Sequence, residues 1–237
     1  MQKHSFKLNT PWVESDLFKV YLKLKSKKFI NLAKKFNKDG YVIIDLNLSK
    51  KNLKKIVEDI SKLAADQNAK KNPKIYHYNK NPRLIEGFKK FKSIKNLFKN
   101  KKILEILEYF YEKKPIPINS INFIKGTDQP LHSDYIHFSS MPHKYLSAAW
   151  IALEKTEEEN GPLFVVPGSH KLDLIDYSLF GLKPPTSTQE LSKFYKIYEE
   201  YVSQLIKVKK LKTKTIKLEP GQAIIWAANL LHGGKKI

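Results

Sequence analysis

Cysteine is missing from the 237-residue sequence, and so is any long hydrophobic run. Without cysteine the chain cannot build a disulfide scaffold, a thiolate zinc site or an iron–sulfur cluster, and it has no thiol nucleophile. No apolar stretch approaches the roughly 20 residues that a membrane-spanning helix needs. Residues 1–10 contain no apolar segment of the kind that a secretory signal has. From these absences we expect a cytoplasmic protein that does not enter a membrane.

Arginine is almost missing as well. The formal net charge is +21, yet Arg83 is the only arginine, and the lysines are spread along the whole chain. Arginine is the side chain that binds phosphate and guanine through two parallel hydrogen bonds. A chain that is basic through lysine therefore argues against a specific nucleic-acid partner, and compositional drift in an AT-rich genome explains the charge. A lysine-mediated binder of nucleic acid or of an anionic surface stays open as a rival class of function.

The residues that are present suffice for a folded core. The chain is 41% hydrophobic and 12% aromatic, which excludes global disorder. Residues 1–115 are predicted to be mainly helical, with a short buried strand at 41–46 and a loop at 70–82 whose Tyr76-His77-Tyr78 is a candidate lid. The expected helices cover residues 16–39 with a break at 25–28, a segment that Ser49 caps and that reaches Ala64, and residues 84–99 and 101–113.

After Pro115 the pattern changes to short β-like runs separated by glycine, proline and asparagine. Several strands at such spacing favour a sandwich or a barrel over a parallel sheet. One helix is expected at 188–208, where Ser187 to Glu190 resembles a capping box. We therefore expect an α+β fold, in which a mainly helical part, 1–115, packs on a β-rich part, 116–237. The expected strands cover residues 116–124, 145–153, 163–166, 213–218 and 223–226.

The segment His132-Ser133-Asp134 is the first candidate for chemistry. Side chains alternate along extended backbone, so a histidine and an aspartate two positions apart point to the same side. Two such ligands can hold one face of a divalent metal, and a third from a distant strand completes a 2-His-1-carboxylate triad with open positions. His232 is the downstream candidate, and the set suits Fe(II), a bidentate cosubstrate and O2. Alone, His-x-Asp is a weak motif, because a lone histidine is more often an ordinary surface or core residue.

The surrounding segments give this motif its context. Residues 160–171 read Asn-Gly-Pro-Leu-Phe-Val-Val-Pro-Gly-Ser-His-Lys, and residues 36–42 read Phe-Asn-Lys-Asp-Gly-Tyr-Val. Gly126-Thr127 leads into His132, and Trp150 follows it. In this order and spacing the chain, from residue 29 to its end, resembles the phytanoyl-CoA dioxygenase family.

The resemblance implies a single oxygenase domain over residues 1–237, whose core is a double-stranded β-helix of the jelly-roll or cupin-like kind. It further implies a non-haem Fe(II)- and 2-oxoglutarate-dependent dioxygenase that uses O2 to hydroxylate a C–H bond of a small-molecule substrate. By position, His132, Asp134 and His232 would be the metal ligands and the catalytic centre. Related halogenases lack the carboxylate, so the presence of Asp134 favours hydroxylation.

The same resemblance suggests where 2-oxoglutarate would bind. Asn122 matches a position that contacts 2-oxoglutarate in similar enzymes, and Gln129 and Trp150 are candidates on the same grounds. Trp150 is equally well explained as a core aromatic residue of the strand at 145–153.

Other histidines are given lesser roles. His170 belongs to a Pro-Gly-Ser-His turn that looks mainly structural in this family, with a direct catalytic role as the alternative. His137 is expected to line the pocket or to orient a ligand. His4, His77 and His143 are expected to take no part.

One family feature has no counterpart in the sequence. Similar enzymes have an arginine on the strand after the distal histidine, where it pairs with the far carboxylate of 2-oxoglutarate. The sequence ends at Ile237, Lys235 and Lys236 lie too close to His232 to match that position, and Arg83 falls in the helical part. Two explanations stay open, a truncated chain or a natural short form, and we favour truncation because a jelly roll that stops early leaves an unpaired sheet edge. A truncated or cosubstrate-impaired member would act as a metal- or ligand-binding protein without efficient turnover.

Overall fold

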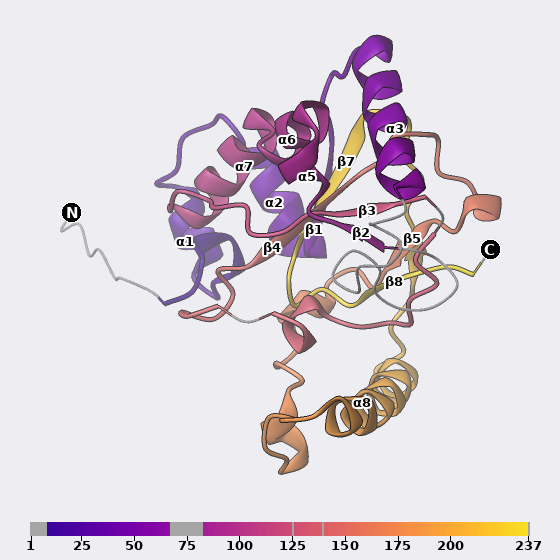
Figure 1. Ribbon diagram of the computed structural model, residues 1–237. Helices are drawn as coiled ribbons and strands as arrows, with labels where there is room; N and C mark the ends of the chain where they lie inside the picture. The colour runs from indigo at the N-terminus through magenta and orange to yellow at the C-terminus, as the bar shows by residue number, and fades with distance from the viewer. Residues whose placement is uncertain (1–8, 67–82, 125, 139, 237) are drawn as a thin grey trace.

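The computed structural model describes residues 9–66, 83–124, 126–138 and 140–236. His4 and the candidate lid at 76–78 lie outside the described residues. Within them the chain forms a mixture of helices and small antiparallel sheets (Figure 1). No helix among the described residues combines the length and the apolar character needed to cross a membrane.

The central sheet joins the two ends of the chain. β1 (Tyr41–Asp45) and β4 (Ser147–Ile151) both pair antiparallel with β7 (Gln222–Ala227), which lies between them. Residues 223–227 read Ala-Ile-Ile-Trp-Ala and are all buried, as expected for a strand covered on both faces. The N-terminal part therefore contributes a strand to the same sheet as the C-terminal part, and residue 115 marks no boundary between sheets.

Two further sheets complete the β structure. β2 (Arg83–Ile85) pairs with β3 (Ile121–Phe123), and β5 (Leu163–Val165) lies between β6 (Lys214–Thr215) and β8 (His232–Gly234). The predicted helix at 84–99 is wrong at its start, because residues 83–85 extend to pair with β3. The sequence did not predict β8 because His-Gly-Gly has low strand propensity.

Glycine is nevertheless required in β8. A Cβ on Gly234 would clash with Oγ1 of Thr127, and one on Gly233 would lie 2.8 Å from the backbone oxygen of Gln129. The backbone of residues 127–132 therefore runs directly against β8, and this close approach brings the His132 segment beside His232.

Two helices of the N-terminal part, α2 (Ile30–Asp39) and α7 (Lys101–Tyr111), cover one face of the central sheet. They enclose a core with β1 and β7, and the short turn η1 (Trp12–Glu14) joins the same core. α3 (Lys50–Ala65) begins as predicted at Ser49, whose hydroxyl accepts from the amide of Asn52. The expected break in the first helix is confirmed. The remaining helices here are α1 (Phe18–Leu22), α5 (Gly87–Lys90) and α6 (Lys92–Phe98).

The other face of the central sheet packs on the strand β5. Tyr41, Ile224 and Trp226 from the central sheet share a buried cluster with Leu163 and Val165 of β5. Side chains of β1 and β7 are therefore buried on both faces, between the helices and the second sheet.

α8 (Thr188–Val208) lies below the rest of the molecule in Figure 1. It starts as predicted, with the Ser187 hydroxyl accepting from the amide of Glu190, but the Glu190 carboxylate accepts from Thr186. Its buried face holds Tyr198, whose hydroxyl accepts from the amide of Ser133 at 2.8 Å. The helix thus fixes the backbone between His132 and Asp134. The short turns of this half are η2 (Asp134–Ile136), η3 (Glu158–Asn160), η4 (Ser169–Lys171) and η5 (Tyr177–Phe180).

Candidate metal centre

The fold brings His132, Asp134 and His232 together. One ligand atom from each lies within 4.8 Å of the other two. His132 and His232 are direct antiparallel neighbours: each backbone amide donates to the other's carbonyl oxygen at 2.9 Å, and the ring centroids are 4.4 Å apart. Asp134 follows where the chain turns into η2, and its amide donates to the carbonyl of Ala228 at 2.8 Å. Main-chain hydrogen bonds therefore set all three positions.

Both triad histidines present the same ring nitrogen to the site. Nδ1 of His132 lies 2.8 Å from the carbonyl oxygen of Pro130, and Nδ1 of His232 lies 2.9 Å from that of Leu230. A carbonyl oxygen can only accept, so each Nδ1 carries the proton and each Nε2 keeps its lone pair. This is the arrangement in which a backbone group orients a histidine toward a metal ion.

The carboxylate of Asp134 is oriented in the same way. Oδ2 accepts a hydrogen bond from Nε1 of Trp226 at 2.9 Å, and Oδ1 lies 3.6 Å from Nε2 of His232. One oxygen is thereby fixed by β7, and the other faces the two rings. The sequence pattern does not indicate this role for Trp226, because the residue lies in an apolar strand and is expected to be a core aromatic residue.

The electrostatics favour the ligand form of His132. Burial lowers the pKa of His132 well below its ordinary value, and the neighbouring His232 ring lowers it further. The set offers the Nε2 atoms of two histidines and one carboxylate, a donor chemistry that fits Fe(II) and other divalent ions. His132 and Asp134 come from one segment and His232 from β8, and all three face one point, so the arrangement can hold one face of an ion and leave the opposite face to other ligands.

The turn at 167–171 positions the segment that leads to His232. The Ser169 hydroxyl accepts from the amide of Leu231 at 2.8 Å, and the Asn229 side-chain amide donates to the carbonyls of His170 and Leu172. The His170 ring itself is buried beside Gly40 (φ +82°), where a Cβ would lie 2.5 Å from Nδ1 of His170. Burial lowers the pKa of His170 to about 4. The structure therefore supports the structural reading of this turn.

The three cosubstrate candidates have different surroundings. The Asn122 side-chain amide donates to the carbonyl of Leu84 at 3.1 Å, so it joins β3 to β2. Trp150 lies in β4 and packs against the buried cluster of Ile224 and Trp226. Only Gln129 contacts other polar side chains near the triad, because it lies between Arg83 and His137.

Arg83 is the residue that sequence reasoning missed. Its chain position placed it in the helical part, but the pairing of β2 with β3 brings its guanidinium to Gln129 at 2.6 Å. Only the tertiary pairing reveals this proximity. His137, as expected, lies against the site, with its ring centroid 5.5 Å from that of His132.

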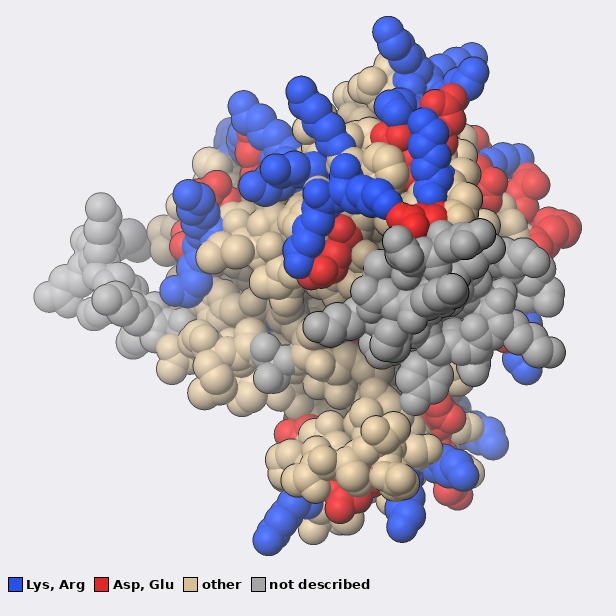
Figure 2. Space-filling model, viewed as in Figure 1, with Lys and Arg blue, Asp and Glu red and all other residues tan. Residues whose placement is uncertain are grey.

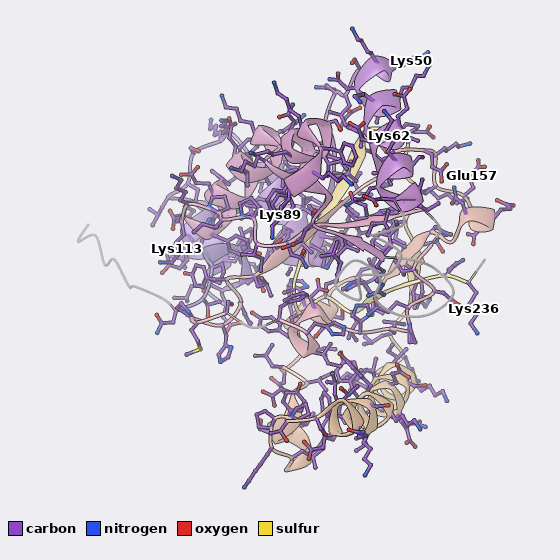
Figure 3. The ribbon with its side chains drawn as sticks, viewed as in Figure 1. Lys50, Lys62, Lys89, Lys113, Glu157 and Lys236 are labelled. Atoms are coloured by element: carbon purple, nitrogen blue, oxygen red, sulfur yellow. The ribbon has the colours of Figure 1, made fainter. Side chains whose placement is uncertain are left out.

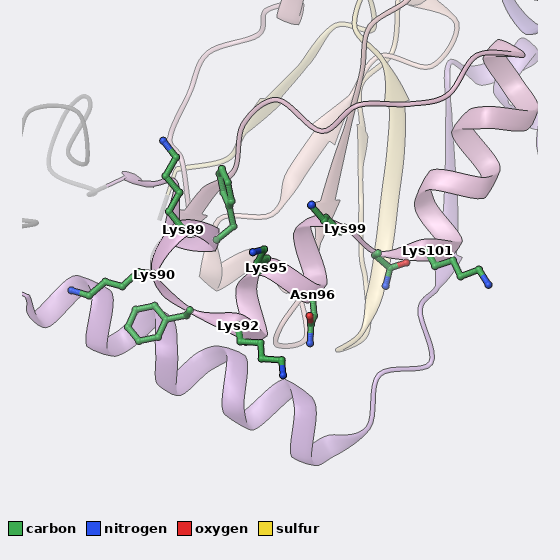
Figure 4. A pocket seen from close by; sticks show the side chains of 10 residues that line it. Lys89, Lys90, Lys92, Lys95, Asn96, Lys99 and Lys101 are labelled. Carbon is green, nitrogen blue, oxygen red and sulfur yellow. The ribbon is translucent and has the colours of Figure 1, made fainter.

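A cluster of positive charge lies away from the triad. Lysines gather over the helices at the top of the view in Figure 2, while Figure 3 places Lys50, Lys113 and Lys236 at separate points on the periphery. A pocket of about 750 Å³ over α5, α6 and the start of α7 contains no triad residue (Figure 4). Its lysines, all exposed, are Lys89, Lys90, Lys92, Lys95, Lys99 and Lys101.

Comparison with known proteins agrees with the site. The family model for phytanoyl-CoA dioxygenase (PhyH) matches residues 36–237. A Caenorhabditis elegans protein named a probable phytanoyl-CoA dioxygenase is 27% identical over 194 residues, which cover 81% of this chain and 54% of that protein. A Stutzerimonas stutzeri protein named a probable alpha-ketoglutarate-dependent hypophosphite dioxygenase is 28% identical and covered over 56% of its length. The chain thus spans about half the length of the curated relatives it matches.

Solved structures share the fold. EctD from S. alaskensis, crystallised with 2-oxoglutarate and 5-hydroxyectoine, superposes with a TM-score of 0.66 at 21% identity, over 85% of this chain and 68% of that one. The same protein has been crystallised with bound Fe, with a TM-score of 0.64. The non-heme alpha-ketoglutarate-dependent carbocyclase SnoK gives a TM-score of 0.62 at 16% identity, over 90% of this chain and 79% of that one.

Proposed function

The chain belongs to the phytanoyl-CoA dioxygenase family, and from this premise we propose that it is a non-haem Fe(II)- and 2-oxoglutarate-dependent dioxygenase that hydroxylates a C–H bond of a small molecule. One observation supports this most strongly. His132 and His232 both turn Nε2 to the same point as the Asp134 carboxylate, with each Nδ1 held by a backbone carbonyl. Two histidines with a purely structural role would not need to direct Nε2 to the same point.

The proposal gives each residue of the triad a task. His132, Asp134 and His232 would hold Fe(II), and bound iron with 2-oxoglutarate and O2 would supply the oxidising chemistry. Trp226 fixes one carboxylate oxygen of Asp134, and the carbonyls of Pro130 and Leu230 keep the rings in the ligand tautomer. The presence of Asp134 favours hydroxylation over halide transfer, because a halide would need the position that the carboxylate takes.

The fold assignment within this proposal is a double-stranded β-helix in one oxygenase domain. The two three-stranded antiparallel sheets, β1-β7-β4 and β6-β5-β8, support it because they pack face to face with the triad at one end. Small-molecule chemistry is supported by relatives such as EctD, whose crystal contains 5-hydroxyectoine.

Turnover without a known substrate tests the proposal. Purified protein is incubated in air with 2-oxoglutarate, with and without Fe(II), and succinate is measured. We expect succinate that depends on iron, that is lost in His132→Ala, and that persists in His143→Ala, a control histidine exposed at the surface. Iron binding through His132 without any succinate would instead indicate the cosubstrate-impaired alternative.

A further inference from the structure

The only arginine of the chain lies beside the candidate metal centre. Arg83 begins β2 opposite Phe123 of β3, and its guanidinium lies 5.8 Å from the centre of the Phe123 ring. Nη2 donates to Oε1 of Gln129 at 2.6 Å. Backbone pairing on one side and a side-chain hydrogen bond on the other hold the guanidinium in one place.

A chain of polar contacts leads from Arg83 to the triad. A guanidinium has only donors, so Oε1 of Gln129 faces Arg83 and the amide nitrogen faces Nε2 of His137, at 3.4 Å. Nδ1 of His137 lies 2.7 Å from the hydroxyl of Tyr195, in α8. We call Arg83, Gln129, His137 and Tyr195 the Arg83 cluster.

The Arg83 cluster lies against His132. The ring centroid of His137 is 5.5 Å from that of His132 in an edge-on arrangement. Segments from β2, from the loop before His132, from the residue after η2 and from α8 thus converge on one side of the triad.

The charge balance of the Arg83 cluster is incomplete. Arg83 is half-buried, and burial lowers the pKa of its guanidinium. Among the residues that the structure describes, no carboxylate forms an ion pair with it, and the neutral amide of Gln129 accepts one of its five N–H groups. A partly desolvated cation without a counter-ion is costly, and a carboxylate that accepts two parallel hydrogen bonds would offset the cost.

We propose that Arg83 binds a carboxylate of the ligand that occupies the metal centre, with Gln129 as the positioning residue that aims the guanidinium. The inference rests on the function proposed above and deepens it, because it names the chemical group that the site recognises. Two sources share this chemistry, the far carboxylate of 2-oxoglutarate and a carboxylate of the substrate. No lysine of the exposed pocket offers such a fork, since an ammonium group is a point charge.

Binding measured by titration calorimetry distinguishes the sources. The full chain is loaded with Mn(II) and titrated without O2 with 2-oxoglutarate and with 2-oxopentanoate, which has the same 2-oxo acid end and lacks the second carboxylate. If Arg83 binds the cosubstrate, Arg83→Gln weakens 2-oxoglutarate binding by about 10- to 100-fold and leaves 2-oxopentanoate unchanged. Arg83→Lys should recover only part of the loss, because it restores the charge without the fork.

A second titration covers the substrate and the metal-free case. Hexanoate is added to the protein with Mn(II) and 2-oxoglutarate, and to the metal-free protein, and chemical shifts are followed. If Arg83 binds the substrate carboxylate, Arg83→Gln loses hexanoate binding and keeps 2-oxoglutarate binding. Should the wild type fail to bind Mn(II) while hexanoate binding still depends on Arg83, the proposed function fails and the carboxylate site stands.

A control variant and a check of folding accompany these titrations. Lys99→Gln removes one positive charge from the exposed pocket and should bind every probe as the wild type does. Circular dichroism and melting temperature confirm that Arg83→Gln is folded. If folded Arg83→Gln binds all three probes as tightly as the wild type, the assignment is wrong.

Discussion

The lysine pocket and the triad hold polar groups in opposite ways. The pocket's six lysines are exposed along α5, α6 and the start of α7. At the triad, by contrast, each histidine Nδ1 and one oxygen of Asp134 have a fixed partner within 2.9 Å. Exposed charges are screened by solvent and salt, whereas buried groups with set partners keep one geometry. The positive charge and the fixed polar groups therefore lie in different places, and the triad is the one of the two that has the fixed geometry a metal site needs.

The largest expected effect is the removal of a triad ligand. Asp134→Asn keeps the shape of the side chain and its contact with Trp226, but it replaces the anionic oxygen with a neutral amide. We expect iron-dependent succinate formation to fall by at least about 100-fold, since even residues that only orient metal ligands cost 10- to 100-fold. The matched control is Asp173→Asn, which changes an exposed carboxylate. Equal activity of both variants would show that Asp134 is not a ligand.

A smaller effect is expected where a partner of the triad segment is removed. Ser169→Ala leaves the buried amide of Leu231 without its acceptor, which should lower the free energy of unfolding by about 1–3 kcal/mol. Metal affinity should fall with it, because Leu231 precedes His232. Ser203→Ala on the exposed side of α8 is the control and should change neither quantity. Chemical denaturation and metal titration measure the two effects. An unchanged metal affinity in Ser169→Ala would show that the turn at 167–171 does not position the metal ligands.

Glu14 contrasts with the triad groups, because one buried oxygen of its carboxyl group has no hydrogen-bond partner in the described part of the chain. Burial raises the pKa of this carboxyl group to about 8. The folded protein keeps this proton up to about pH 8 while the unfolded chain loses it near pH 4.5. Stability is therefore greatest below pH 4.5 from this group and falls as pH rises through 8, by at most about 1.4 kcal/mol per pH unit.

Glu14→Gln should remove that dependence. We expect its melting temperature to exceed that of the wild type above pH 8 and to approach it in mild acid. Melting curves across this range measure the difference. A wild-type slope that survives in Glu14→Gln would mean that another group titrates.

The smallest effect is expected in the lysine pocket. Lys95→Gln combined with Lys99→Gln removes two exposed charges from a pocket whose lining contains no triad residue. We expect iron binding and succinate formation to stay within about twofold of the wild type, and the free energy of unfolding to change by less than about 0.5 kcal/mol. A marked loss of activity would contradict the contrast between pocket and triad, because it would show that the exposed lysines contribute to the reaction.

The sequence predicted those features that depend on local pattern. Ser49 and Ser187 each cap the expected helix, and Tyr41–Asp45 forms the expected strand. The sequence also predicts His132, Asp134 and His232 as a set, from alternation along extended backbone and from the neighbouring family-like motifs. The structure brings the three together within 4.8 Å.

Features that depend on long-range pairing were not predictable. Arg83 lies next to the triad only because β2 pairs with β3, and the residues of β2 also read as a helix start. The strand β8 is not predictable from the sequence, because its two glycines have low strand propensity. Glycine is needed there because the backbone of residues 127–132 passes close to β8. The sequence does not indicate a polar role for Trp226, because its hydrogen bond to Asp134 joins residues that are far apart in the chain. Side-chain partners across the fold leave no periodic signal in the chain.

Metal stoichiometry shows whether His132, Asp134 and His232 form one metal site. Purified protein is titrated with Fe(II) without O2, and bound iron is counted for the wild type, His232→Ala and His143→Ala. We predict one bound ion per chain in the wild type and in His143→Ala, and none in His232→Ala. Iron bound with the same stoichiometry and affinity in His232→Ala would contradict this prediction.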